Sequence, residues 1–116
     1  MKSLKISLVL FFTLILLIFL NALYIHSCAD RLSEAAEKIS VGGSPQQLES
    51  FWEKNKEYIG LSISETQLDH ISRLVVSIRC DHEHEDEAEL KKDLALLTEA
   101  AEGLRQYEKL SVKNIF

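Results

Sequence analysis

Residues 6–20 read ISLVLFFTLILLIFL, and this stretch decides how the rest of the chain must be organised. Thirteen of the fifteen residues are apolar and none carries a charge. Extended from Leu4 to Ile25, the run has 22 residues, and as a helix it would reach about 33 Å. The hydrocarbon core of a bilayer is about 30 Å thick. The sequence therefore predicts a transmembrane helix over about residues 4–25.

A cleaved secretory signal is the main competing interpretation of this segment. Ser27-Cys28-Ala29 has the small residues of a cleavage site, and residues 25–28, IHSC, distantly resemble a lipoprotein acylation site. The apolar run is long for a signal, however, and Tyr24 lies where aromatic residues favour the membrane–water boundary. We expect an uncleaved signal-anchor, with a lipoprotein acylated at Cys28 as the alternative.

Charge predicts the orientation of the anchor. Lys2 and Lys5 precede the span without an acidic residue, whereas mixed charges follow it. The positive-inside tendency predicts a cytoplasmic N-terminus and an extracytoplasmic C-terminal domain at the cell membrane. The exported part carries all 18 acidic residues but only 11 of the 13 basic ones, a net charge of −7. Such a domain repels phosphate backbones, which excludes nucleic acid as a partner.

The chain divides into an anchor, residues 1–28, and an extracytoplasmic domain, residues 29–116. The second part has 88 residues, enough for one small domain. It contains one proline, its glycines are at positions 42, 43, 60 and 103, and no useful run alternates at strand period. We expect an all-α protein, in which the N-terminal transmembrane helix is followed by a small antiparallel helical bundle.

Capping signals set the expected helix limits. The anchor helix should continue to about Ile39 and end at Gly42-Gly43, because glycine accepts left-handed backbone angles. In residues 44–47, SPQQ, Ser44 is the expected N-cap and Gln47 closes a capping box. Gly60 ends that helix, and a second box, residues 64–67, opens the next.

Apolar residues recur at helical spacing in each of the three outer helices. The expected inward faces are Leu48, Phe51, Trp52, Tyr58 and Ile59; Leu68, Ile71, Leu74, Val75 and Ile78; and, in a last helix from about Asp86 to Tyr107, Leu90, Leu94, Leu97, Ala101 and Leu104. Trp52 is therefore expected in the core. Gly103 is expected to mark the close approach of a neighbouring helix. The tail, residues 110–116, is expected to dock against the bundle.

Residues 80–87, CDHEHEDE, place a thiol and two imidazoles within an acidic run. On a helix Cys80 shares a face with His84, and His82 shares one with Asp86, so the four side chains are metal-ligand candidates. His82 and His84 do not share a face, and no second ligand cluster follows. We expect a solvated turn between helices, with no metal site and no cofactor.

The sequence gives little support for a disulfide bond or for catalysis. Cys28 and Cys80 could form a disulfide in an oxidising compartment, but reduced cysteines, or a lipid on Cys28, are favoured. No nucleophile motif and no phosphate-binding loop is present, so we do not expect an enzyme.

Three stretches carry a family resemblance: residues 52–56, WEKNK; Leu68 with Ile71; and residues 110–116, LSVKNIF. Together with the anchor they resemble domain-of-unknown-function family 4363, which comprises bacterial membrane proteins. The resemblance implies a short single-pass protein with a helical outer domain, and it implies no activity. The family often shows Ile-Asp-His where this chain has Ile63-Ser64-Glu65, and His70 does not fill that position. No role of the family's histidine is therefore assigned to any residue of this chain.

The expected function is that of an interaction or structural module. Its partners would be the lipid bilayer, through residues 4–25, and another membrane or envelope protein or a second copy of the chain. The alternative is a metal-binding or metal-sensing envelope lipoprotein that uses Cys80, His82 and His84.

Overall fold

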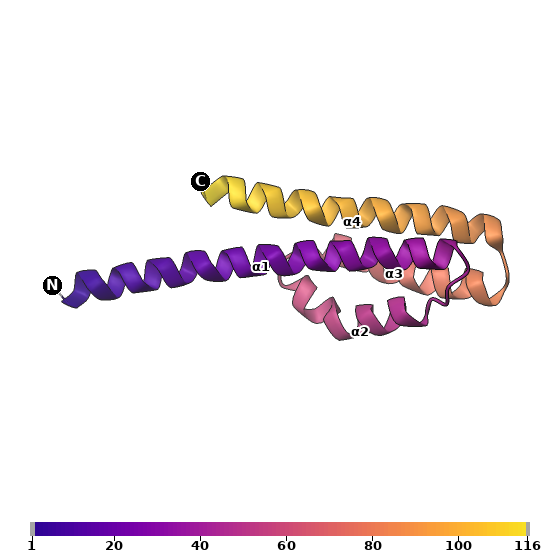
Figure 1. Ribbon diagram of the computed structural model, residues 1–116, viewed down its shortest axis with the longest axis horizontal. Helices are drawn as coiled ribbons and strands as arrows, with labels where there is room; N and C mark the ends of the chain where they lie inside the picture. The colour runs from indigo at the N-terminus through magenta and orange to yellow at the C-terminus, as the bar shows by residue number, and fades with distance from the viewer. Residues whose placement is uncertain (1, 116) are drawn as a thin grey trace.

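The computed structural model describes the backbone of residues 2–115 and the side chains of residues 2–106. Within these limits the chain forms four helices joined by short turns (Figure 1): α1 (Lys2–Ser40), α2 (Gln46–Gly60), α3 (Glu65–Glu83) and α4 (Glu87–Ile115). The molecule is 67 Å long and 23 Å across. The predicted all-α fold is confirmed.

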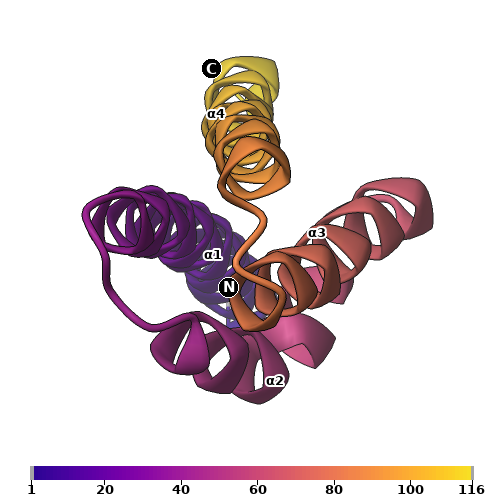
Figure 2. The same cartoon turned by 90° about the vertical axis from the view of Figure 1, so that its right-hand side faces the viewer.

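The four helices occupy the corners of an antiparallel bundle, as the end-on view in Figure 2 shows. α1 contacts α2 and α4, and α3 contacts the same two helices. The most extensive contact is between α1 and α4, which run side by side in opposite directions. The short turns explain why consecutive helices are neighbours. A helix that follows a short turn packs antiparallel to the helix before it.

α1 has two environments along one unbroken helix. Its first part projects beyond the other three helices (Figure 1), and its buried residues begin only at Ala22. From there to Ile39, buried side chains recur at spacings of three and four, as expected for one face of a helix. The predicted boundary between residues 28 and 29 falls inside this helix, and Ile25 and Cys28 on the anchor side belong to the core.

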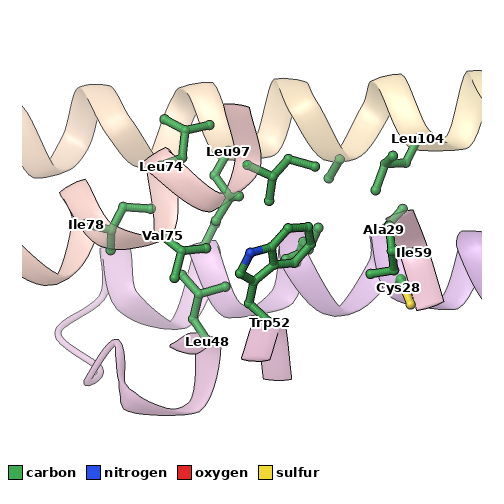
Figure 3. Close-up of a cluster of buried hydrophobic side chains, with 14 of the residues drawn as sticks. Cys28, Ala29, Leu48, Trp52, Ile59, Leu74, Val75, Ile78, Leu97 and Leu104 are labelled. Carbon is green, nitrogen blue, oxygen red and sulfur yellow. The ribbon is translucent and has the colours of Figure 1, made fainter. Parts of the chain in front are cut away.

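The core joins side chains from all four helices. Its members in α2, α3 and α4 include Leu48, Trp52, Ile59, Ile71, Leu74, Val75, Ile78, Leu94, Leu97, Ala101 and Leu104. Trp52 lies in the middle of them (Figure 3) and is 2% exposed, which confirms its predicted place. Its indole Nε1 donates a hydrogen bond to Ser72 Oγ at 2.9 Å, so the polar edge of the ring is satisfied.

Tyr58 departs from the predicted face of α2. It is 64% exposed, whereas the next residue, Ile59, is fully buried. Adjacent residues on a helix point about 100° apart, so the two side chains face different surroundings at the end of α2. Ile59 faces the core and Tyr58 points outward.

The two predicted capping boxes have different outcomes. At α3 the box forms, because Ser64 Oγ accepts from the N–H of Gln67 at 3.2 Å and the Gln67 side chain returns to the Ser64 backbone. At α2 the predicted box is wrong. Ser44 Oγ accepts instead from the N–H of Gln46 at 3.2 Å, and the helix begins after Pro45 without the reciprocal glutamine contact.

α4 is longer than predicted, since its backbone remains helical to Ile115. The side chains of the predicted docking tail, residues 110–116, lie outside the described residues. The prediction that Gly103 marks a close approach is wrong: apart from its own helix backbone and its chain neighbours, no heavy atom of the described residues lies within 4 Å of the position that a Cβ there would occupy.

Gly103→Ala is therefore expected to stabilise the bundle. Alanine is favoured over glycine inside a helix by about 1 kcal/mol, and the added methyl group would clash with no described side chain. Urea unfolding of the full-length chain in detergent, followed by circular dichroism, would measure the gain. Gly60→Ala is the matched control, because its Cβ would lie 3.0 Å from Leu68 Cδ2 and should bring no such gain. An equal effect of the two substitutions would contradict the argument.

Candidate functional site

The exposed half of α1 is an apolar surface that carries no charge after Lys5. Its large side chains are mostly more than half exposed, and they include Leu4, Ile6, Val9, Leu10, Phe11, Phe12, Leu14, Leu16, Leu17 and Leu20. Thr13 Oγ1 donates to the carbonyl of Val9 at 2.7 Å, so its hydroxyl needs no water. By length and composition, α1 is able to cross a membrane.

Polar side chains fix the bundle to α1 at the point where this apolar surface ends. Ser62 Oγ, in the turn between α2 and α3, donates to Asn21 Oδ1 at 3.0 Å. Tyr24 Oη, one turn further along α1, donates to Asn55 Oδ1 of α2 at 2.7 Å. Asn55 in turn donates from Nδ2 to the carbonyl of Phe51 at 2.9 Å. The turn and α2 are therefore held in one position relative to the anchor.

A shallow uncharged groove surrounds these hydrogen bonds. It is lined by Leu20, Asn21, Tyr24, Asn55, Tyr58 and Leu61. Leu61 is 85% exposed at the tip of the turn. Sequence reasoning missed this group, because its members come from two segments that lie far apart in the sequence, residues 20–24 and 55–61, and only tertiary packing brings them together.

An ion pair joins α4 to the first part of α1 inside the bundle. Arg105 donates to Asp30 Oδ1 from Nη2 at 2.8 Å and from Nε at 3.2 Å, and it also contacts Ser33 Oγ and Glu102 Oε2. The guanidinium group lowers the pKa of the Asp30 carboxyl group below its ordinary value. This two-pronged contact sets the register of α4 against α1.

The predicted metal-ligand candidates lie at the far end of the bundle, away from the anchor. Cys80 is half-buried in the last turn of α3, while His82, His84 and Asp86 are exposed. The His84 ring Nδ1 is 2.7 Å from the Cys80 carbonyl oxygen, and Asp86 Oδ1 accepts from the N–H of Glu89. These are contacts of helix ends. Among the described residues, no three histidine, cysteine or acidic side chains converge on one point.

The double substitution His82→Ala and His84→Ala is expected to change the free energy of unfolding by less than about 0.5 kcal/mol, because both side chains are exposed. Unfolding with and without added zinc, in the native and the substituted chain, would check this. A zinc-dependent stabilisation that disappears in the double variant would instead support the metal-binding alternative.

Two carboxyl groups face each other between α3 and α4 at the same end. Asp93 is 9% exposed, and Asp81 Oδ2 is buried without a donor from the described residues. Two such carboxyl groups can bond only by sharing a proton. The hydrogen bond to Asp93, together with burial, raises the pKa of Asp81 to about 6; Asp86 adds to the rise and His84 opposes it.

This pair makes stability depend on pH. Since the pKa of Asp81 is higher in the folded chain than its ordinary value of 3.8, its contribution is complete below pH 3.8 and is lost as the pH rises through about 6. Asp81→Asn, which keeps a neutral hydrogen-bonding group, is expected to stabilise the chain at pH 8 by about 1 kcal/mol after allowance for solvent screening.

The check is the difference in unfolding free energy between the native and Asp81→Asn chains, measured from pH 4 to pH 8. That difference should grow as the pH rises. Asp69→Asn, an exposed substitution on the same helix, is the control for the loss of one carboxylate away from Asp93. A flat difference for Asp81→Asn would contradict the shared proton.

The two cysteines lie at opposite ends of the bundle and are both free. Cys28 is buried in α1, and burial raises the pKa of its thiol; the nearby Tyr24 hydroxyl and Arg31 partly oppose this. A buried thiol with a raised pKa is a poor nucleophile and behaves as a small core side chain.

A groove of about 710 Å³ opens beside Asp81, between the ends of α1 and α3 and the start of α4. Ser40 and His82 both line it, which is the pair of residue types that nucleophilic catalysis uses. The Ser40 hydroxyl, however, donates to the carbonyl of Glu37 at 2.6 Å. It is engaged by its own helix and is not activated by a base.

Comparison with protein-family models, with curated proteins and with solved structures finds no match to this chain. The resemblance to domain-of-unknown-function family 4363 therefore stays a prediction, and the case for a function rests on geometry.

Proposed function

We propose that the chain is an uncleaved single-pass membrane protein with a cytoplasmic N-terminus, whose extracytoplasmic bundle serves as an interaction or structural module. One observation carries the proposal. α1 is a single helix whose exposed surface from Ile6 to Leu20 carries no charge and is almost entirely apolar, and whose second half contributes core residues. A surface of this kind is unfavourable in water, and a bilayer is the solvent that suits it.

The core supports an anchor that is retained. Cleavage before Cys28 would remove Ala22 and Ile25, which are 6% and 1% exposed, from the bundle. It would also remove the hydrogen bonds that Asn21 and Tyr24 make to the α2 segment and its turn. A signal peptide contributes nothing to the mature fold, whereas this segment contributes part of the core.

The module would act by contact between helix faces, either with another membrane or envelope protein or with a second copy. Its acidic charge and the engagement of Ser40 by its own backbone favour contact over catalysis. We propose no enzymatic activity.

Topology is testable in whole cells. In a Cys80→Ser background, Val41→Cys should react with a membrane-impermeant maleimide on intact cells, because Val41 is 83% exposed at the far end of α1. Ser3→Cys should react only after permeabilisation. The full-length mass should be recovered from the membrane pellet after alkaline washing. Full-length chain in the soluble cytosol, or a shortened chain in the medium, would overturn the proposal.

Crosslinking in the native membrane, followed by mass spectrometry, would identify the partner. A crosslinked product of twice the chain mass would support self-association, and a heterologous product would support a separate envelope protein.

A further inference from the structure

The turn between α2 and α3 carries an apolar tip that the described side chains leave uncovered. Leu61 is 85% exposed and Tyr58, at the end of α2, is 64% exposed. The hydrogen bond from Ser62 to Asn21 fixes this tip against α1, and Gly60 allows the turn to approach Leu68 closely. The exposure therefore belongs to a fixed part of the molecule.

This tip continues the apolar surface of the anchor. Leu20 and Leu23 on α1 are 53% and 61% exposed, and Leu20 lines the same groove as Tyr58 and Leu61. Figure 1 shows the turn beside α1, where the helix leaves the bundle. The apolar surface thus spreads sideways from α1 onto the turn.

The groove also differs in charge from the rest of the domain. No lining residue is charged, although the exported part carries a net charge of −7. Its polar groups are two amides and two tyrosine hydroxyls, and two of them are already joined, since Tyr24 donates to Asn55. Tyrosine and leucine beside neutral polar groups are the residues that favour the boundary between headgroups and acyl chains.

We propose that Leu61 and Tyr58 form a second membrane contact, which enters the interfacial layer of the bilayer beside the anchor. The inference rests on the proposed function, because the anchor must lie in the membrane for the turn to reach it. Leu20 to Tyr24 form the last turns of the predicted span, so residues packed against them lie at the depth of the interface. The bundle then stands directly on the bilayer, with its acidic far end in solution.

The test is the depth of a fluorophore in full-length protein reconstituted into phosphatidylcholine nanodiscs, at one chain per disc. Three single substitutions, Leu61→Cys, Val41→Cys and Leu10→Cys, are made in the Cys80→Ser background and labelled with nitrobenzoxadiazole. Cys28 is 2% exposed and is therefore expected not to react in the folded chain; the background protein without a new cysteine gives the blank. Equal circular dichroism spectra establish that all three chains are folded.

Quenching is measured with lipids that carry a nitroxide near the headgroup or deep in the acyl chain. At position 61 the shallow nitroxide should reduce emission roughly twofold or more, as for a side chain 5–10 Å into the interface. At position 10 the deep nitroxide should quench more strongly than the shallow one. Position 41 is the matched control, because Val41 is 83% exposed, and it should remain unquenched.

The outcomes separate the two proposals. Quenching at position 10 without quenching at position 61 overturns the second membrane contact and leaves the anchor intact. No quenching at either position overturns the proposed function as well. A blue-shifted but unquenched label at position 61 overturns the lipid assignment, because the tip would then be covered by protein.

Discussion

Arginine in place of both Leu10 and Leu14 is expected to release the chain from the membrane. Both leucines lie in the middle of the exposed half of α1, at 64% and 57% exposure. An arginine at the centre of a transmembrane helix costs about 2.5–3.5 kcal/mol of insertion free energy, so the pair costs about 5–7 kcal/mol. The bundle should still fold, since neither leucine belongs to its core.

Alkaline extraction of membranes would measure the release, and circular dichroism of the released chain would measure folding. The matched control places the same two arginines at Val41 and Val76, which are 83% and 49% exposed on the bundle. That chain should stay in the membrane pellet. Retention of the Leu10 and Leu14 variant would contradict the membrane assignment of α1.

Trp52→Ala is expected to have the largest effect on the stability of the bundle. Truncation of a buried tryptophan costs about 3–5 kcal/mol through lost burial and the cavity left behind. Here the cavity would open in the middle of the core, and the Ser72 hydroxyl would lose its 2.9 Å donor. A domain of this size has a total stability of the order of 5–15 kcal/mol, so most of the margin would disappear.

Urea unfolding in detergent, followed by helical circular dichroism, would measure the loss. Tyr58→Ala removes another aromatic ring from the same helix, but from a side chain that is 64% exposed. It should cost less than about 0.5 kcal/mol. Equal losses for the two variants would show that Trp52 does not organise the core.

Much of the fold is local, and the sequence predicts it well. The inward faces of α3 and α4 follow from three-and-four spacing, because residues at this spacing share one side of a helix and only that side can be buried. The capping box of α3 was predicted for a similar reason, since both partners lie within four residues. The box expected at Ser44 does not form, because α2 begins one residue later, after Pro45. The Ser44 hydroxyl accepts from the N–H of Gln46 instead of from the N–H of Gln47.

The contacts that place the candidate site are not local. The ion pair between Asp30 and Arg105 joins residues 75 positions apart. Neither local sequence indicates which residue the charge will pair with. The sequence also did not predict that Ile25 belongs to the protein core. In a segment that is apolar on nearly every side, the change from exposed surface to protein core leaves no periodic mark in the sequence. For the same reason, the pairing of Tyr24 with Asn55 appeared only in the structure.

In the proposed topology, the unbroken α1 would couple the tilt of the membrane span rigidly to the position of the bundle. Between Lys2 and Ser40 the helix contains neither glycine nor proline, so it has no hinge between anchor and bundle. Transmembrane helices lean by about 20° on average; over the roughly 28 Å from Ala22 to Ser40, such a lean shifts the far end sideways by about 10 Å. Bilayers of different thickness would therefore present that end at different angles and distances.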